Sequence, residues 1–179
     1  MILKHRLDYS DLQYPADDGR RYELVRGMLL VTASSTPRHQ RISSRLARRL
    51  DDYFERRGLG ELFHAPIDLI LTDEDVFVPD LLIVGDPSHV TERGIEGPPL
   101  LVVEILSPST EGRDRGIKAQ RYAELGVAHY WIVDPGTTRV ECFRLAGEGF
   151  GLVIAAQNDE VLAHPDWDGF ALPLGELWR

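Results

Sequence analysis

The chain has 179 residues, of which 43% are hydrophobic and 27% are charged, and its formal net charge is −9. This length and composition predict one globular domain. The acidic balance excludes a surface that binds nucleic acid non-specifically over its whole extent, although it leaves room for a local basic face. The single cysteine, Cys142, excludes an internal disulfide and fits a reducing compartment. Because the N-terminus lacks the apolar run of a signal peptide and no stretch reaches the ~18 apolar residues of a membrane span, we expect a cytoplasmic protein without a membrane segment.

Up to residue 60 the sequence predicts a β-hairpin and one long helix. Two apolar runs, 22–25 and 28–31, flank Arg26-Gly27, which is the pattern of a hairpin turn. A helix is expected from Pro37 to about residue 57. Its apolar residues recur every three or four positions and therefore share one side; they are Ile42, Leu46, Leu50 and Tyr53.

From residue 61 onward the sequence predicts mainly strands, with one further helix at 114–125 and a short apolar stretch at 174–178. The expected strands are 61–71, 76–85, 100–106, 129–133, 140–145 and 151–156. This order of helices and strands predicts an α/β or α+β fold with a mixed central sheet. We expect a single domain over residues 1–179, in which residues 146–179 add C-terminal strands and a short helix.

Two acidic residues, Asp80 and Glu104, interrupt apolar runs that are expected to be core strands. Because alternate residues of a strand face opposite sides, Glu104 shares its face with Val102 and Leu106. An ionised carboxylate buried there without a partner would cost several kcal/mol, roughly. Each acid therefore has a cationic partner, lies near a strand end, or holds a metal ion.

Either acid alone is explained equally well by a salt bridge to an arginine. Two acids on neighbouring strands favour a site for Mg²⁺, which binds one or two carboxylates together with water. Lys118, on the helix that follows the Glu104 strand, is one of two lysines in the chain. An ammonium group beside a metal site polarises a phosphate or assists an attacking water, whereas on spacing alone a solvated helix lysine is the simpler interpretation.

The first helix carries four arginines on a side away from its apolar residues: Arg38, Arg41, Arg45 and Arg48. A DNA phosphate backbone could lie along this side. The alternative is a solvated, arginine-rich face that pairs with nearby acidic residues of the same helix.

The ordered set of motifs resembles the PD-(D/E)XK nuclease superfamily. Pro79-Asp80 resembles its Pro-Asp motif, and Glu104-Ile105-Leu106 resembles its acid-x-Lys motif, with Leu106 in the place of the lysine. In one branch, the Uma-two family of candidate restriction endonucleases, the following helix supplies the lysine, and Lys118 matches that position. The resemblance covers roughly residues 20–145, through matches in order and spacing at 23–27, 37–42, 78–80, 103–110, 114–118, Tyr122 and 130–135.

The resemblance implies a three-layer core with a mixed four-stranded sheet and a homodimer that hydrolyses DNA with Mg²⁺, or with Mn²⁺, and without a small-molecule cofactor. It implies that Asp80 and Glu104 hold the metal with the backbone carbonyl of Ile105, and that Lys118 assists the attacking water. It further implies that Glu23 completes the outer ligation and that His39 lies at the edge of the site.

Two alternatives stay open at this point. The chain could be a non-catalytic member of the same fold that binds nucleic acid or a protein partner. It could also be an assembly subunit whose buried acids are only salt-bridged, in which case an arginine should hold Glu104.

Overall fold

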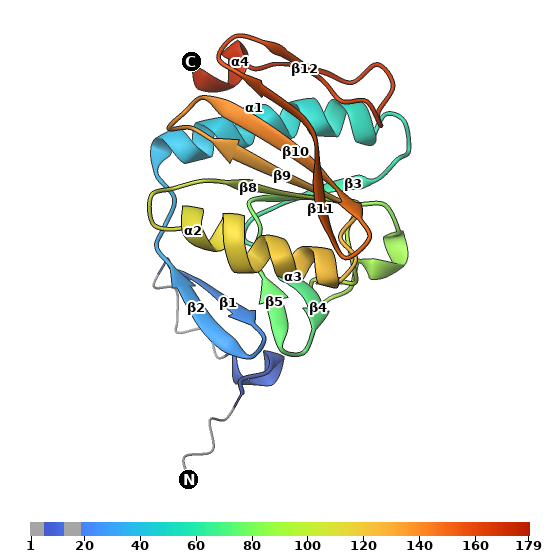
Figure 1. Ribbon diagram of the computed structural model, residues 1–179. Coiled ribbons are helices and arrows are strands. Elements are labelled where there is room, and N and C mark those ends of the chain that lie inside the picture. Colours follow the sequence, from blue (N-terminus) through green and yellow to red (C-terminus); the bar gives the residue numbers. More distant parts are fainter. Residues whose placement is uncertain (1–5, 13–18) are drawn as a thin grey trace.

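The computed structural model describes residues 6–12 and 19–179, and its centre is a six-stranded sheet (Figure 1). The strand order is β11-β10-β9-β8-β6-β3. Strands β8 and β9 run parallel, and the other neighbours are antiparallel, so the sheet is mixed. The strands are β3 (Glu61–His64), β6 (Leu81–Val84), β8 (Leu101–Ile105), β9 (His129–Asp134), β10 (Arg139–Ala146) and β11 (Gly149–Gln157).

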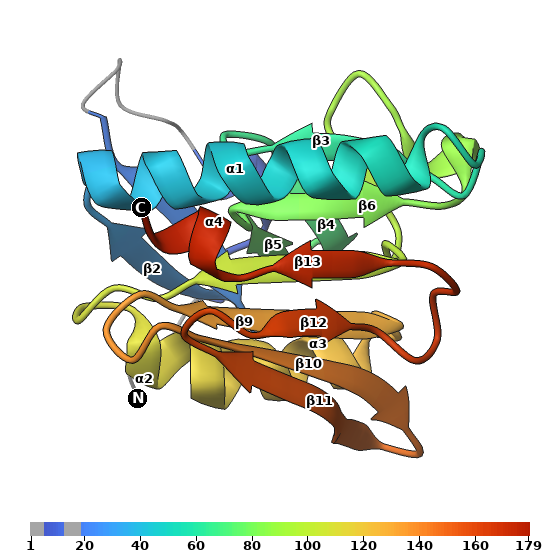
Figure 2. The same cartoon turned by 90° about the horizontal axis from the view of Figure 1, so that it is seen from above.

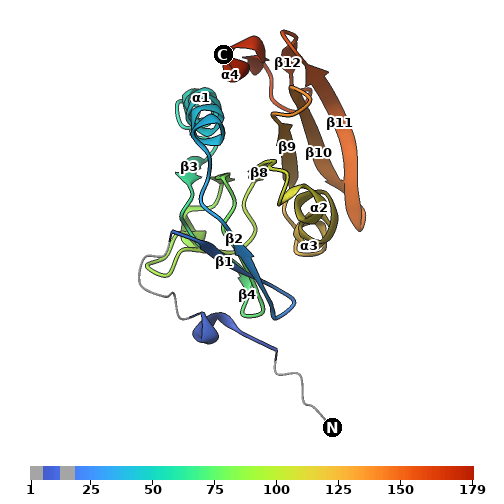
Figure 3. The same cartoon turned by 90° about the vertical axis from the view of Figure 1, so that its left-hand side faces the viewer.

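Helices cover both faces of this sheet. Helix α1 (Pro37–Phe54) lies on one face, where its apolar side packs in one cluster with Val103. On the other face lies a helical segment in which Tyr122 packs in one cluster with Val102. This segment consists of α2 (Glu111–Arg113), the π-helical turn η3 (Asp114–Lys118) and α3 (Ala119–Glu124). Figure 3 shows the sheet between the two helical layers, which confirms the expected three-layer mixed fold with six strands rather than four.

A second, five-stranded sheet packs on the side of α3, in the order β2-β1-β5-β4-β7. Its first two strands form the expected hairpin, in which Arg26 and Gly27 take positive φ values of 51° and 71°, as a tight hairpin turn requires. The strands are β1 (Arg21–Val25), β2 (Met28–Thr32), β4 (Leu69–Thr72), β5 (Asp75–Phe77) and β7 (Ile95–Glu96).

Two expected strands are wrong as single elements. The segment 61–71 divides into β3 and β4, with Pro66 between them, and the segment 76–85 divides into β5 and β6, with Pro79 between them. Proline has no amide hydrogen to donate and is therefore disfavoured inside a sheet. In both cases the two halves join different sheets, so Asp80 lies at the junction of the sheets rather than inside a strand.

The tail of the chain completes the core on the α1 side. It forms a small two-stranded sheet of β12 (Val161–Ala163) and β13 (Ala171–Pro173), followed by α4 (Gly175–Trp178). Figure 2 shows α4 beside α1, and Leu177 of α4 belongs to the same apolar cluster as Leu46. Two short 3₁₀ turns, η1 (Tyr9–Asp11) and η2 (Pro87–His89), lie outside the sheets. Among the described helices, none has the length and apolar character to cross a membrane.

Asp75 ties the hairpin to α3. Its carboxylate accepts hydrogen bonds from the amide of Arg26 at 3.0 Å and from the guanidinium of Arg121 at 2.7 Å. Burial by itself would raise the pKa of Asp75, but the hydrogen bonds from Arg121, Arg26 and Thr72 hold it below the ordinary value of 3.8. The hairpin carries Glu23 and the helical segment carries Lys118, so this contact fixes two site elements relative to each other.

Asp75→Asn is expected to lower the free energy of unfolding by about 3 kcal/mol at pH 7, because it removes the buried carboxylate from the partly buried Arg121 guanidinium, which keeps the exposed Glu124 as its acidic partner. A depressed pKa in the folded state supplies stability that is present above the unfolded pKa and is lost as the pH falls through the folded value. The difference between parent and variant in urea unfolding should therefore shrink below about pH 3.8. Glu74→Gln, which changes a neighbouring half-exposed acid, should change stability by no more than about 0.5 kcal/mol. If Asp75→Asn lowered the free energy of unfolding equally at pH 7 and at low pH, the stabilising role of the ionised Asp75 carboxylate would be contradicted.

Candidate active site

A pocket of about 430 Å³ collects the side chains that the sequence singled out. It is lined by the start of β1, the loop before α1, the first turn of α1, the end of β8 and the turn η3. Asp80, Glu104, Lys118, Glu23 and His39 all border it. The structure therefore brings together residues that lie up to 95 positions apart in the chain.

Lys118 lies at the centre of a buried cluster of charges. Its Nζ is 2.6 Å from Glu104 Oε1, 2.9 Å from Glu23 Oε1 and 3.5 Å from Asp114 Oδ1. All four side chains are at most 6% exposed. Among the described residues, one ammonium group thus faces three carboxylates, and the cluster has an excess of negative charge.

The pKa shifts of the cluster have one physical origin. Burial raises the pKa of Glu104 well above its ordinary value, with Lys118 opposing and the neighbouring acids adding to the effect. Burial likewise raises the pKa of Asp114. Burial would lower the pKa of Lys118, but the charges of Glu104, Glu23 and Asp114 raise it well above its ordinary value. All three directions mean that the cluster attracts positive charge, and Lys118 stays protonated.

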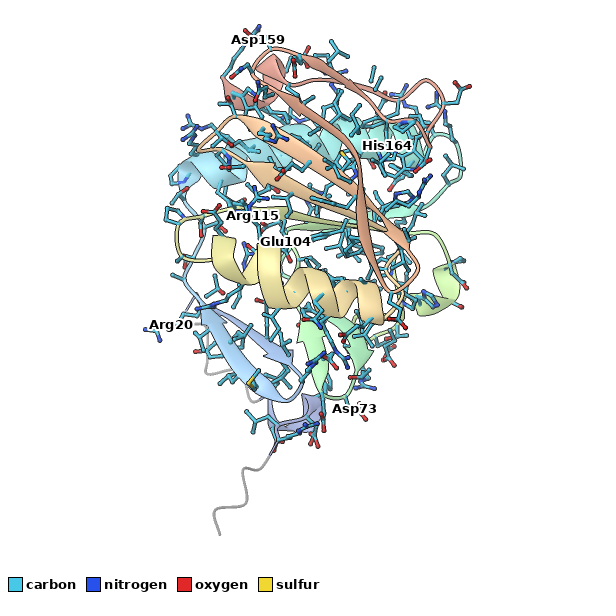
Figure 4. All side chains as sticks on the ribbon, in the orientation of Figure 1. Arg20, Asp73, Glu104, Arg115, Asp159 and His164 are labelled. Carbon is cyan, nitrogen blue, oxygen red and sulfur yellow. The ribbon has the colours of Figure 1, made fainter. Side chains whose placement is uncertain are left out.

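Glu104 is oriented by a tyrosine as well as by the lysine. Tyr122 donates its hydroxyl hydrogen to Glu104 Oε1 at 2.9 Å. Lys118 and Tyr122 are four residues apart, so they project from the same side of the helix. In Figure 4 Glu104 lies inside the outline of the molecule beside the α2–α3 segment, whereas Arg20 and Asp73 lie at its edge. The ion-pair partner of Glu104 in the described part of the chain is a lysine and not an arginine.

Asp80 has a different environment. Its Oδ1 accepts from Arg21 at 2.6 Å, and its Oδ2 accepts from the amide of Ile105 at 2.8 Å and lies 3.0 Å from His39 Nε2. Burial would raise the pKa of Asp80, but the hydrogen bond and charge of His39, the charge of Arg21 and the Ile105 amide hold it below its ordinary value. Asp80 is therefore ionised and rigidly held.

His39 lies deeper than the edge position that the resemblance implies. Its Nε2 is 3.0 Å from Asp80 Oδ2 and 3.1 Å from the carbonyl oxygen of Ile105. One imidazole nitrogen thus lies within hydrogen-bond distance of two of the oxygen atoms that, by the resemblance, hold a metal ion.

The sequence assigned no role to three charged residues of the site, Arg21, Arg113 and Asp114. Arg21 lies two positions before Glu23 in β1, so strand alternation puts both on one face. Asp114 lies one helical turn before Lys118. These spacings could have found Arg21 and Asp114 once Glu23 and Lys118 were accepted as site residues.

Of the four helix arginines, Arg38 borders the pocket and donates to the carbonyl of Pro135 at 2.6 Å. Arg45 donates to the carbonyls of Leu177 and Arg179, and Arg48 donates to Ser44. Arg41 lies with Arg38 and Arg45 around a smaller hollow next to Trp178. A contact of this side with DNA stays a prediction.

A second group of possible metal ligands, His129, His164 and Asp166, has donor atoms within 4.8 Å of one another. Asp166 already pairs with Arg144 at 2.6 Å, and the amide of Asp166 donates to His164 Nδ1. His164 also stacks on Trp167 with ring centroids 4.0 Å apart. The guanidinium and the stacking favour a packed aromatic cluster over a cation site.

The family model described as "Putative restriction endonuclease" (Uma2) matches residues 7–175. The chain belongs to the Uma2 family. The resemblance inferred from the motifs is thereby confirmed, and the match extends through the tail beyond residue 145. Membership places the chain among nuclease-like proteins.

Two individual proteins resemble this Uma2 member. "Uncharacterized protein slr1290" of Synechocystis sp. (strain ATCC 27184 / PCC 6803 / Kazusa) is 26% identical over 153 residues, which is 84% of this chain and 80% of that protein. The crystal structure titled as "a putative nuclease belonging to DUF820" from Anabaena variabilis ATCC 29413 superimposes with a TM-score of 0.70 at 18% identity. It covers 88% of this chain and 89% of that one, and it confirms the fold.

Proposed function

We propose that this Uma2 protein is an endonuclease that hydrolyses DNA phosphodiester bonds with a divalent metal ion, Mg²⁺ or Mn²⁺. The observation that carries the proposal is the charge imbalance in the pocket, where Lys118 faces three buried carboxylates beside the ionised Asp80. An excess of buried negative charge is unfavourable unless a cation offsets it.

The residues at this place fit a hard cation. Asp80, Glu104 and the backbone carbonyl of Ile105 offer oxygen atoms, which Mg²⁺ prefers, and all three residues border the pocket. Glu23 and Asp114 border the same pocket and pair with the Lys118 ammonium at 2.9 Å and 3.5 Å. We assign Asp80, Glu104 and Ile105 as ligands and Glu23 as a supporting group.

A bound Mg²⁺ polarises a phosphoryl oxygen and lowers the pKa of a coordinated water. The chain's own contribution is mainly electrostatic. Because Lys118 stays protonated, it offsets the charge that develops on the phosphate and orients the water by hydrogen bonding, and it does not accept the proton. Arg38 and Arg113 border the pocket and present guanidinium groups of the kind that bind phosphate.

We propose DNA as the substrate and a homodimer as the acting form. The net charge of −9 opposes broad DNA binding, so contact with the phosphate backbone should be confined to arginines around the pocket and along α1. The alternative is a non-catalytic member that binds nucleic acid or a protein partner, and of these two the net charge favours the protein partner. Analytical sedimentation measures whether the protein is a dimer. The metal-binding experiment below distinguishes the nuclease from the non-catalytic binding protein.

Calorimetric titration with Mg²⁺ and Mn²⁺ tests the proposal directly. We expect the parent to bind and Asp80→Ala to lose binding, while Asp52→Ala, which removes an exposed acid of α1, binds like the parent. Metal-dependent cleavage of plasmid DNA should then follow binding and stop with a chelator. A parent that binds neither ion, with or without DNA, would overturn the metal-dependent function and favour the non-catalytic alternative.

His39→Ala is expected to tighten metal binding about tenfold. The imidazole Nε2 lies within hydrogen-bond distance of both Asp80 Oδ2 and the Ile105 carbonyl oxygen. A hydrogen bond to a charged group contributes about 1.5–3 kcal/mol, and a cation that binds these oxygen atoms must replace that contribution. Calorimetry of His39→Ala against the exposed His64→Ala measures the difference. Weaker binding in His39→Ala would mean that the imidazole supports the metal instead of competing with it.

A further inference from the structure

The turn that carries Lys118 is not a regular helix. Between α2 and α3 the backbone widens into the π-helical turn Asp114–Lys118, and Gly116 within it has φ −107° and ψ −105°. Helical residues lie near φ −63° and ψ −42°, so the backbone departs from helical geometry at Gly116. Crowding does not explain the glycine, because a Cβ at Gly116 would meet no atom within 4 Å. The turn therefore leaves helical geometry at a glycine, the residue with the widest choice of backbone conformations.

A buried tyrosine holds the start of the same turn. Tyr130, on β9, donates its hydroxyl hydrogen to the carbonyl oxygen of Asp114 at 2.9 Å. A side-chain group that inserts into the backbone hydrogen bonds of a helix is one of the recognised causes of helix irregularity. The ring of Tyr130 is fixed by Tyr122 and by stacking on Phe150, with centroids 5.4 Å and 5.5 Å away. Tyr130 thus anchors the turn to the central sheet.

The charged side chains of the turn lie on two sides, some in the pocket and one at the surface. Asp114 at its start and Lys118 at its end are both buried and lie in ion-pair contact. Arg115, between them, points outward and pairs with Glu141 at 2.6 Å. The ammonium group reaches three carboxylates because the backbone from Asp114 to Lys118 follows this irregular path.

We infer that Gly116 and Tyr130 are positioning residues that place the Lys118 ammonium in the candidate active site. Gly116 permits the backbone path of the turn, and Tyr130 holds that path against β9. Gly116 has no side chain, and the Tyr130 hydroxyl donates to the Asp114 carbonyl rather than to a proposed metal ligand, so both residues act through the turn that carries Lys118. The catalytic consequence of this inference rests on the proposed nuclease function, whereas the structural consequence does not.

The experiment uses the scarcity of lysine. The chain has two, Lys4 and Lys118, so protein labelled with ¹³C,¹⁵N-lysine gives two side-chain signals. In the parent we expect slow exchange of the Lys118 ammonium protons with water, because the group is buried and hydrogen-bonded. In Tyr130→Phe and in Gly116→Ala, exchange should be at least tenfold faster and the Lys118 signal should shift. Metal-dependent turnover should fall about 10- to 100-fold, with metal affinity retained.

Two matched variants serve as controls. Tyr53→Phe removes a tyrosine hydroxyl that also donates to a backbone carbonyl at 2.9 Å, away from the pocket. Gly112→Ala adds a Cβ to a helical glycine that has open space around it. Both should leave the Lys118 signal and the turnover unchanged.

Unchanged Lys118 exchange in folded Tyr130→Phe would overturn the inference, even if Gly116→Ala fails to fold. Altered exchange in a protein without nuclease activity would instead retain the positioning role and reject the proposed function.

Discussion

Glu104→Gln is expected to abolish metal-dependent DNA cleavage while the protein remains folded. Glutamine keeps the shape of the side chain and an oxygen that accepts from Tyr122 and Lys118, but it removes the charge that binds a cation. Burial raises the pKa of Glu104, so the ionised carboxylate is disfavoured in the folded state. Removing its charge should therefore leave the melting temperature unchanged or raise it.

Plasmid cleavage measures the activity, calorimetry measures the binding of Mg²⁺, and thermal unfolding of the same samples measures the melting temperature. Glu61→Gln, on the exposed side of β3, is the matched control and should behave like the parent in all three. Cleavage by Glu104→Gln at the parent rate would remove Glu104 from the catalytic site.

Lys118→Met is expected to have the largest combined effect on activity and stability. Methionine retains much of the length of the lysine side chain but removes its charge. Glu23, Glu104 and Asp114 are then left buried without the ammonium group. Breaking a buried ion pair from one side costs about 3–5 kcal/mol of stability. Loss of an electrostatic catalyst lowers turnover about 10²–10³-fold.

Divalent cations should raise the melting temperature of Lys118→Met more than that of the parent, because the three carboxylates lose their ammonium partner and tighter binding of a ligand stabilises the folded state more. The double variant Lys118→Met/Glu23→Gln, which removes one uncompensated charge, should recover part of the stability and none of the turnover. Thermal unfolding with and without Mg²⁺ and steady-state cleavage rates check both statements. A Lys118→Met protein as fast as the parent would mean that the ammonium group has no part in the reaction.

The hairpin, the long helix α1 and the sides of β8 could be predicted because they depend on local patterns. Arg26-Gly27 marks the turn, and the apolar side of α1 follows from a spacing of three or four residues. The strand breaks at Pro66 and Pro79 were missed, since each apolar run reads as continuous. Which sheet each half joins depends on pairing with distant strands, such as β1 with β5 and β6 with β8.

Periodicity and ordered motifs are local properties of the chain, and they were enough to predict the fold class, the family and the side of β8 on which Glu104 lies. The cationic partner of each acid, in contrast, depends on how separate segments of the chain pack together. Glu104 contacts a lysine 14 positions away, and Asp80 contacts an arginine 59 positions away. The π-helical turn could not be predicted from the sequence either, since a tyrosine of β9 holds it in place. Contacts of this kind require distances near 3 Å between remote segments, and such distances exist only after the sheets and helices have packed together.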